Sequence, residues 1–432
     1  SWSRGLGDVY KRQELLGAAV VMSLIKIINA DASLIEIENY INVQKATEIV
    51  IGILLSVFIA FSIGAIIQWI SRVILTFDFE SKSILLNCIF GSLSFTSIIN
   101  FILIKGIKGT PYSSQTFSIL DDLTINEFID SNILFFWIIS LIFWFIFSLF
   151  ISKILKLDIY KIIIGVGTFS LALAFAGNDL VNFIGVPIAA LESFQLWSAS
   201  SLTASEYSMI SLSEKVNTKP IYLFLSGLIM VITLWFSSKA KNVVKTSLDL
   251  SNQNDTDEKF KANPVGKSLV MLGVFLNELL KKLLPKGLLN QINQSFTLKD
   301  NYTEAKSVDG IRPSFDKLRA CLNLVIAAIL ISIATSYQLP LSTTYVTFMV
   351  AMGTSLSDRA WSSDSAIYRV SGVVSVIGGW FLTAFSAFLI CGLVVFTIHQ
   401  LKITGILMTI IFVSIIIFKN HRKFKKKGEI NI

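Results

Sequence analysis

The stretch Ala176-Gly177-Asn178-Asp179-Leu180-Val181-Asn182 places a carboxylate, two carboxamides and a glycine in the middle of a long apolar run. The mostly apolar residues 161–175 precede it, and residues 183–190 continue in the same character. An ionisable group at membrane depth is costly, so an intramembrane carboxylate is by default a functional residue. The stretch therefore predicts a break in a membrane helix, and the rest of the chain can be interpreted around it.

A second polar interruption, Pro340-Leu341-Ser342-Thr343-Thr344, lies far downstream in a similar apolar setting. Pro340 suits a position just outside a helix start, and Ser342 is a natural N-cap. Such a start aims backbone N–H groups and the three hydroxyls at one point, where the helix dipole is positive. This donor set matches a small tetrahedral oxyanion.

The composition predicts an all-α polytopic membrane protein. The 432 residues are 53% hydrophobic and only 15% charged, and many apolar runs reach the ~20 residues that span a bilayer. These runs are too long for barrel strands of ~10 alternating residues. The net charge of +8 is concentrated in loops and the tail, which fits the positive-inside rule rather than a nucleic-acid partner.

The pattern divides the chain into five segments. Residues 1–13 resemble a non-native leader, with a native amphipathic N-terminus as the alternative. The long hydrophilic linker at residues 237–316 is expected to be a solvated tether, with a regulatory or partner-binding role as the alternative. The remaining predicted segments are a transmembrane region with the Asn-Asp motif (14–236), a cytoplasmic linker (237–316), a transmembrane region with the Ser-Thr-Thr motif (317–419) and a basic cytoplasmic tail (420–432).

Hydropathy also predicts the individual helices. Trp69 and Arg72 suit an interfacial anchor at the end of the first long span. The linker and the tail are both expected in the cytoplasm, so an even number of crossings must lie between them. Three spans are evident there, and the Ser-Thr-Thr segment must supply the fourth as a broken helix. If it were a re-entrant hairpin, one of the other spans would be miscounted. The expected helices cover residues 47–77, 84–104, 132–154, 161–176, 183–201, 220–236, 318–337, 345–356, 370–398 and 403–418.

The first break has the chemistry of a cation site. Gly177 lets the chain leave helical geometry. Asp179 and the side-chain carbonyls of Asn178 and Asn182 are hard oxygen ligands suited to Na⁺, and Asp179 could alternatively carry a proton. An interhelical clamp at this motif, and helix-packing Ser and Thr residues at the other, are the structural alternatives. Glu192 is a second membrane carboxylate, with structural and functional roles equally open.

These residues resemble the paired signatures of the inorganic phosphate transporter (PiT) family. The likeness lies in Ala-Gly-Asn-Asp-Leu-Val-Asn-Phe and Leu-Pro-Leu-Ser-Thr-Thr-Tyr, and it extends from Glu14 to the basic tail. The resemblance implies an inverted-repeat secondary transporter with broken helices and an ion-coupled symport of phosphate. It further implies that Asn178, Asp179 and Asn182 bind the coupling ion, Na⁺ or H⁺. The implied phosphate ligands are Ser342, Thr343, Thr344 and Asp179, and Ser342 and Thr343 would also contact Na⁺.

The chain departs from the family pattern in two ways. Tyr345 stands where many members have His, which leaves the coupling ion open. Each motif also occurs once, whereas the family has two copies. Aligning Glu14–Val20 with Val350–Leu356 matches Gly17 with Gly353 and predicts that the first repeat is incomplete through N-terminal truncation.

Three other functions are alternatives to phosphate symport. A transporter for sulfate or arsenate would need the same donor set. A polytopic enzyme or a channel is less consistent, because His399 and His421 show no catalytic spacing and no pore-lining charge pattern repeats. We therefore expect no enzyme activity, cofactor or nucleic-acid partner. The expected partners are phosphate, membrane lipid and at most a second copy in a homodimer, in a bacterial inner membrane with the C-terminus cytoplasmic.

Overall fold

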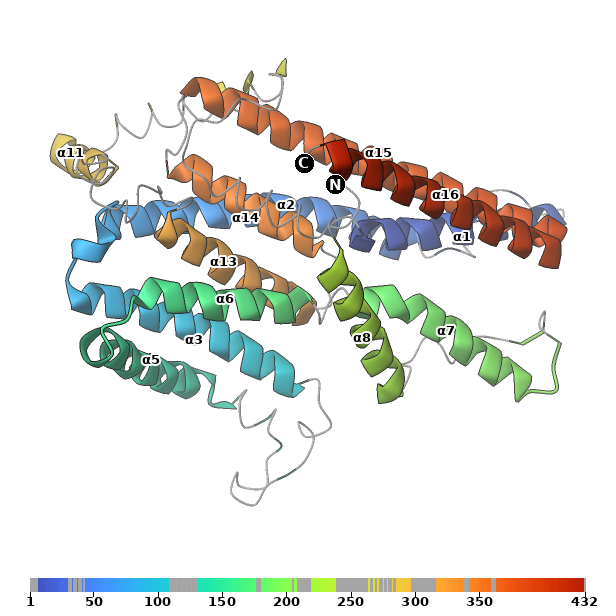
Figure 1. Cartoon of the computed structure of the whole chain (residues 1–432), viewed down its shortest axis with the longest axis horizontal. Coiled ribbons are helices and arrows are strands. Elements are labelled where there is room, and N and C mark those ends of the chain that lie inside the picture. The colour runs from blue at the N-terminus through green and yellow to red at the C-terminus, as the bar shows by residue number, and fades with distance from the viewer. Residues whose placement is uncertain are drawn as a thin grey trace. The chain divides into compact units, whose positions relative to one another are not determined.

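The described part of the chain is helical and contains no strand beyond one isolated bridge between Thr116 and Thr124. This computed structural model (Figure 1) describes residues 7–29, 43–108, 131–175, 180–203, 219–237, 285–296, 316–336, 342–358 and 363–430, with isolated positions between them. The predicted all-α fold class is confirmed. The helices are α1 (Gly7–Asn29), α2 (Val43–Leu75), η2 (Phe79–Ser81), α3 (Ile84–Lys108), α5 (Ile133–Leu149), the π turn η5 (Phe150–Ile154), α6 (Ile159–Phe175), α7 (Val181–Ser198), α8 (Pro220–Phe236), α11 (Lys286–Ser295), α13 (Lys317–Ser336), α14 (Thr343–Ser357), α15 (Ser363–Leu401) and α16 (Ile403–Ile430).

Five helices of the described residues are long and apolar enough to cross a membrane. Their spans are Val50–Leu75, Leu134–Ile154, Lys317–Ala334, Phe381–Leu401 and Ile403–Asn420. Four shorter apolar helices accompany them. In α8 no residue is buried, and side chains such as Trp235 and Phe236 are exposed. Apolar faces of this kind suit contact with lipid, so the chain is an integral membrane protein.

The chain forms two compact units, each of which combines segments distant in sequence. The first comprises residues 1–8 and 49–375, and the second comprises residues 9–48 and 376–432. The predicted boundaries at residues 236 and 317 separate loop from membrane segments and do not mark these units. Residues 7–13 of the predicted leader belong to α1.

In the first unit α3 and α5 pack as an antiparallel pair. The Ser92 hydroxyl donates to the carbonyl of Leu141 over 2.7 Å. The ring of Phe95 lies 5.3 Å from that of Trp144, centroid to centroid. Gly91 allows this approach, because a Cβ there would lie 2.9 Å from the hydroxyl oxygen of Ser148. Aromatic residues of α5 thus serve packing on the face that meets α3.

Helices α6 and α13 form the other side of this layer and both contact α3 (Figure 1). The Cys321 thiol of α13 donates to the carbonyl of Tyr160 in α6. The Tyr160 hydroxyl in turn donates to the side-chain oxygen of Asn87 in α3 over 2.9 Å. These contacts join the first turns of three helices, so α3, α6 and α13 begin at the same end of the unit.

Helix α14 runs back along α13 and also crosses α2. Thr354 contacts Asn323 of α13, so the segment that begins at Thr343 returns to the end where α13 began. Helix α14 is thus antiparallel to α13, and the membrane crossing that parity requires of the Ser-Thr-Thr segment stays a prediction. At the crossing with α2, a Cβ at Gly353 would overlap the carbonyl oxygen of Phe61, and one at Gly64 would lie 2.9 Å from the carbonyl oxygen of Val350.

The second unit contains α1, most of α15 and α16. A Cβ at Gly17 would overlap the carbonyl oxygen of Phe388, and a Cβ at Gly392 would lie 2.9 Å from a methyl group of Val21. The helices α15 and α16 are joined at Lys402, whose φ of 50° is left-handed. Its N–H donates to the carbonyl of Ile398 over 2.7 Å, which closes the helix end.

Part of the linker is ordered as helix and contacts the first unit. In α11 the Ser295 hydroxyl donates to the carbonyl of Val73 over 3.2 Å. Ile292 is buried, and so is Phe296 directly after the helix. Further upstream, the backbone N–H of Asn263 donates to the hydroxyl of Ser371 over 2.9 Å. These parts of residues 237–316 therefore contact the membrane helices, unlike a wholly solvated tether.

Candidate functional site

The Ser-Thr-Thr break lies between α13 and α14, where the sequence predicted it. Ser342 is the N-cap of α14, with extended backbone angles of −106° and 121°. Its carbonyl accepts the first helical hydrogen bond from Val346 over 3.1 Å. Pro340 and Leu341 lie outside the described residues. The predicted helix start at Ser342 is confirmed.

The side chains at this start are buried within the protein. Ser342 and Thr343 are buried and Thr344 is half-buried. The hydroxyl of Ser342 makes no capping bond and has no hydrogen-bond partner among the described residues. A buried polar group is normally hydrogen-bonded, so this hydroxyl beside a helix N-terminus is available to donate to a ligand. The geometry suits an oxyanion that would accept from the hydroxyl and from backbone N–H groups.

The Asn-Asp motif is only partly within the described residues. Helix α6 ends at Phe175 and α7 begins at Val181, so two helices flank the predicted break. Asn178 and Asp179 lie outside the described residues, and the side chain of Asn182 does as well. Their contact with Ser342, Thr343 and Thr344 stays a prediction. Glu192 lies half-buried on α7, one turn beyond Pro187.

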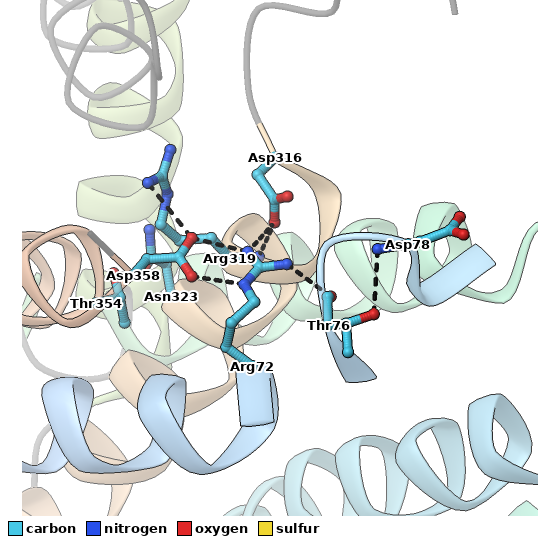
Figure 2. A network of polar contacts seen from close by, with 8 residues as sticks. All are labelled: Arg72, Thr76, Asp78, Asp316, Arg319, Asn323, Thr354 and Asp358. Carbon is cyan, nitrogen blue, oxygen red and sulfur yellow. Dashed lines mark hydrogen bonds and ion pairs between the residues drawn. The ribbon is translucent and has the colours of Figure 1, made fainter. Parts of the chain in front are cut away.

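The most extensive buried polar contacts of the described residues lie elsewhere, at the end of α2 (Figure 2). There Arg72 forms an ion-pair cluster with Asp316, Arg319 and Asp358, which we call the Arg72 clasp. All four side chains have almost no exposed surface. Arg72 comes from α2, Asp316 and Arg319 from the start of α13, and Asp358 from the end of α14.

Arg72 uses its guanidinium in several directions at once. Its Nε and Nη2 donate to the two carboxylate oxygens of Asp358 over 2.5 and 2.7 Å. Nη2 also lies 3.1 Å from Oδ1 of Asp316. Nη1 donates to the carbonyl of Thr76 over 2.9 Å, and the ring of Phe77 lies 3.9 Å below the guanidinium carbon. The bidentate pair with Asp358 and these further contacts hold the guanidinium in one position.

The other members extend the clasp along α13 and α14. Asp316 accepts from the backbone N–H of Arg319 over 2.8 Å, which is a helix N-cap. Nη1 of Arg319 lies 3.7 Å from Asp358. One turn deeper, the Thr354 hydroxyl donates to the side-chain oxygen of Asn323 over 2.6 Å. The two positive and two negative charges balance, so the cluster leaves no net charge in the interior.

The prediction that Arg72 is an interfacial anchor is wrong. Its side chain is fully buried, whereas the neighbouring Trp69 is 41% exposed and faces outward as an anchor would. The available signal was an arginine within an apolar span, which by itself indicates an internal partner. The partner Asp358 lies 286 residues away in the chain, and no spacing rule connects the two.

Two further observations bear on what the chain binds. Within the described residues, no group of three or more His, Cys, Asp and Glu side chains could hold a metal ion. Comparison with protein-family models, curated proteins and solved structures gave no match for this chain. The resemblance to the PiT family therefore rests on the two motifs, and the structure by itself gives a helical membrane protein with a polar helix break.

Proposed function

We propose that this chain belongs to an ion-coupled transporter of inorganic phosphate, as a member of the PiT family. The observation that carries the proposal is the buried hydroxyl of Ser342, which has no partner among the described residues and lies at the N-terminus of α14. Irregular backbone at membrane depth occurs where it lines a cavity or a binding site. Half-helix starts of this kind bind anionic groups in secondary transporters.

In this proposal one break binds the anion and the other binds the coupling cation. Ser342, Thr343 and Thr344 donate to phosphate. Asn178, Asp179 and Asn182 supply oxygen ligands for Na⁺, or Asp179 carries H⁺. Tyr345 is buried next to the break and stands where many family members have His, so this proposal assigns coupling to Asp179. The membrane is proposed to be the bacterial inner membrane, with the basic C-terminus in the cytoplasm.

Sulfate is the second candidate substrate, since it is also a tetrahedral oxyanion. Hydrogen phosphate carries a proton and can donate a hydrogen bond, whereas sulfate only accepts. A carboxylate such as Asp179 beside the anion would therefore favour phosphate. A membrane enzyme has no comparable support in the sequence, because His399 and His421 lie far from both breaks.

Uptake into vesicles tests this proposal. The complete protein in proteoliposomes should take up labelled phosphate when a Na⁺ or H⁺ gradient is imposed. Ser342→Ala should lower uptake at least about tenfold, because the oxyanion loses a buried donor worth about 1.5–3 kcal/mol. Asp179→Asn should abolish coupled uptake. Ser386→Ala is the matched control, since that half-buried hydroxyl donates to the carbonyl of Leu382 in its own helix.

The outcomes separate the alternatives. Phosphate uptake that depends on neither the Na⁺ nor the H⁺ gradient, or no uptake, would contradict ion-coupled phosphate transport. Stronger uptake of labelled sulfate, with Ser342→Ala still impaired, would make sulfate the substrate. Unchanged uptake by Asp179→Asn would identify the Asn-Asp motif as an interhelical clamp.

A further inference from the structure

The Arg72 clasp lies at a defined distance from the Ser-Thr-Thr break. Ser342 and Asp358 are the two caps of α14, and the 15 residues between them rise about 22 Å. Because α14 runs back along α13, the clasp holds both open ends of this hairpin against the end of α2 (Figure 2). The clasp therefore lies between the break and the end of the unit that continues into the 237–316 linker.

We propose that the Arg72 clasp is an ion-pair gate that closes the linker end of the substrate path. This inference rests on the proposed transport function, because a gate needs a path. In the closed state, which the structure shows, Arg72 joins α2 to α13 and α14 and excludes water. In the open state water enters, and the four charged groups separate and become hydrated.

The energetics of buried ion pairs favour a gate over a simple brace. Desolvation of both partners offsets most of the attraction between them, so a buried pair adds little net stability. When a cavity fills with water, each ion recovers its hydration and the pair can part at small cost. An apolar contact has no such compensation, because water does not replace its packing. A balanced set of two arginines and two aspartates can therefore open and close, whereas a single buried charge could do neither.

Polar side chains are buried among the apolar residues between the clasp and the break. Gly64, Gln68 and Arg72 occupy successive turns of α2 on the side that packs against α14. Gln68 is fully buried, and neither its amide nitrogen nor its amide oxygen has a partner among the described residues. Thr354 and Asn323 lie at the same level in α14 and α13. An unpaired amide is costly in a dry core, but it is a suitable lining for a path that fills with water.

The native cysteines provide a test that does not depend on the substrate. Cys321 lies two residues after Arg319, and Cys88 lies in α3; both are fully buried. Alkylation by N-ethylmaleimide of the complete protein, followed by peptide mass spectrometry, measures how often each becomes accessible. Asp358→Asn leaves Arg72 and Arg319 with one carboxylate, so Cys321 should react at least about tenfold faster while Cys88 stays within about twofold of the unaltered protein.

A nearby ion pair supplies the matched control. The Nζ atom of Lys317, at the start of α13, lies 2.6 Å from Oδ2 of Asp158, which directly precedes α6. Both side chains are partly exposed. Asp158→Asn should leave the labelling of Cys321 within about twofold, because exposed pairs contribute little. Equal labelling of Cys321 in Asp358→Asn and the unaltered protein would overturn the gate. Faster labelling of Cys88 as well would also overturn it, since the clasp would then be a brace for the whole unit.

A paired apolar variant tests the gate from the opposite side. Arg72→Met combined with Asp358→Leu removes one charge of each sign and leaves Asp316 with Arg319. Cys321 should stay protected, but phosphate uptake should fall at least about tenfold, because the apolar contact does not open into water. Protected Cys321 with normal uptake would overturn the gate and leave phosphate transport standing. If the unaltered protein takes up no phosphate, the function fails, and the labelling rates still decide whether the clasp opens.

Discussion

Arg72 shows how one residue can fix the ends of three helices. A buried guanidinium needs acceptors for its donors, and here it finds two carboxylates and the carbonyl of Thr76. Thr76 has a φ of 60°, a conformation that a β-branched residue rarely adopts. The hydrogen bond from Arg72 to its carbonyl holds this turn, so the same side chain also sets the direction in which the chain leaves α2.

Removing Arg72 should destabilise the protein far more than removing an exposed cation. Arg72→Ala leaves Asp358 and Asp316 buried beside a single arginine, which should lower the free energy of unfolding by about 3–5 kcal/mol. Arg72→Lys keeps the charge but loses the bidentate geometry. Its free energy of unfolding should therefore lie between those of Arg72→Ala and the unaltered protein. Thermal unfolding in mild detergent measures both.

Lys317→Ala is the control for this prediction. Its ion pair with Asp158 is partly exposed, so its loss should cost less than about 1 kcal/mol. A similar loss of stability in Lys317→Ala and Arg72→Ala would contradict the description of the clasp as a buried, coordinated cluster.

The sequence predicts the role of a single residue where that role depends on its neighbours in the chain. Ser342 was predicted as an N-cap because a serine after proline, ahead of an apolar run, has few other roles. Arg72 could not be placed in the same way, since an arginine next to Trp69 at the end of a span also fits a membrane interface. Its actual role depends on Asp358, and that pairing requires the fold.

The helices themselves are well predicted by hydropathy, and their contacts are not. Residues 220–236 were expected as a span and form α8 with the same bounds. Helix α15 begins seven residues earlier than expected, at Ser363, because backbone hydrogen bonding continues past the apolar residues. Small residues allow particular helices to pack closely, but a glycine in a membrane helix does not show which other helix it contacts.

The crossing of α2 and α14 gives a prediction for an element. Gly353→Ala should destabilise the first unit by at least about 1–3 kcal/mol, because the added methyl would overlap the carbonyl oxygen of Phe61 and push the helices apart. Gly165→Ala, on α6 with nothing within 4 Å, should instead be neutral or stabilising by up to about 1 kcal/mol.

Thermal unfolding of the two glycine variants side by side distinguishes these effects. The Gly353→Ala variant should also label faster at Cys321, since separation of α14 from α2 strains the Arg72 clasp. Equal stability of both variants would mean that α2 and α14 do not approach each other this closely.

At the scale of the whole molecule, the order of helices fixes which segments share a side of the membrane. Because α3 and α5 are antiparallel, the residues before α3 and after η5 lie at one end of the first unit. The end of α3 and the start of α5 lie at the other end. Lys82, Lys153 and Lys156 lie at the first end, and the positive-inside rule predicts that this end faces the cytoplasm.

Labelling of introduced cysteines by an impermeant reagent checks this arrangement. Lys82→Cys and Lys156→Cys should react only from the cytoplasmic side of oriented vesicles. Thr116→Cys, in the connection between α3 and α5, should react only from the opposite side. Reaction of all three from one side would contradict the antiparallel crossing of α3 and α5.

The inverted repeat implied by the family resemblance stays a prediction, although one detail is suggestive of internal similarity. The sequence aligned Gly17 with Gly353, and each of them meets a carbonyl oxygen of a long helix, Phe388 in the second unit and Phe61 in the first. The two units thus use the same kind of close helix crossing. The sequence alone matched the glycines but not the helices against which they pack.

The pairing of Gly17 with Phe388 has a consequence for biosynthesis. The two residues are about 370 positions apart, and at ~5–20 residues per second the ribosome needs roughly 20–75 s to make the second after the first. Throughout that interval α1 lacks its final neighbour, and the face that carries Gly17 is open to lipid or to the insertion machinery. Newly made chains should therefore pass through a long period in which α1 is open to chaperones and membrane proteases.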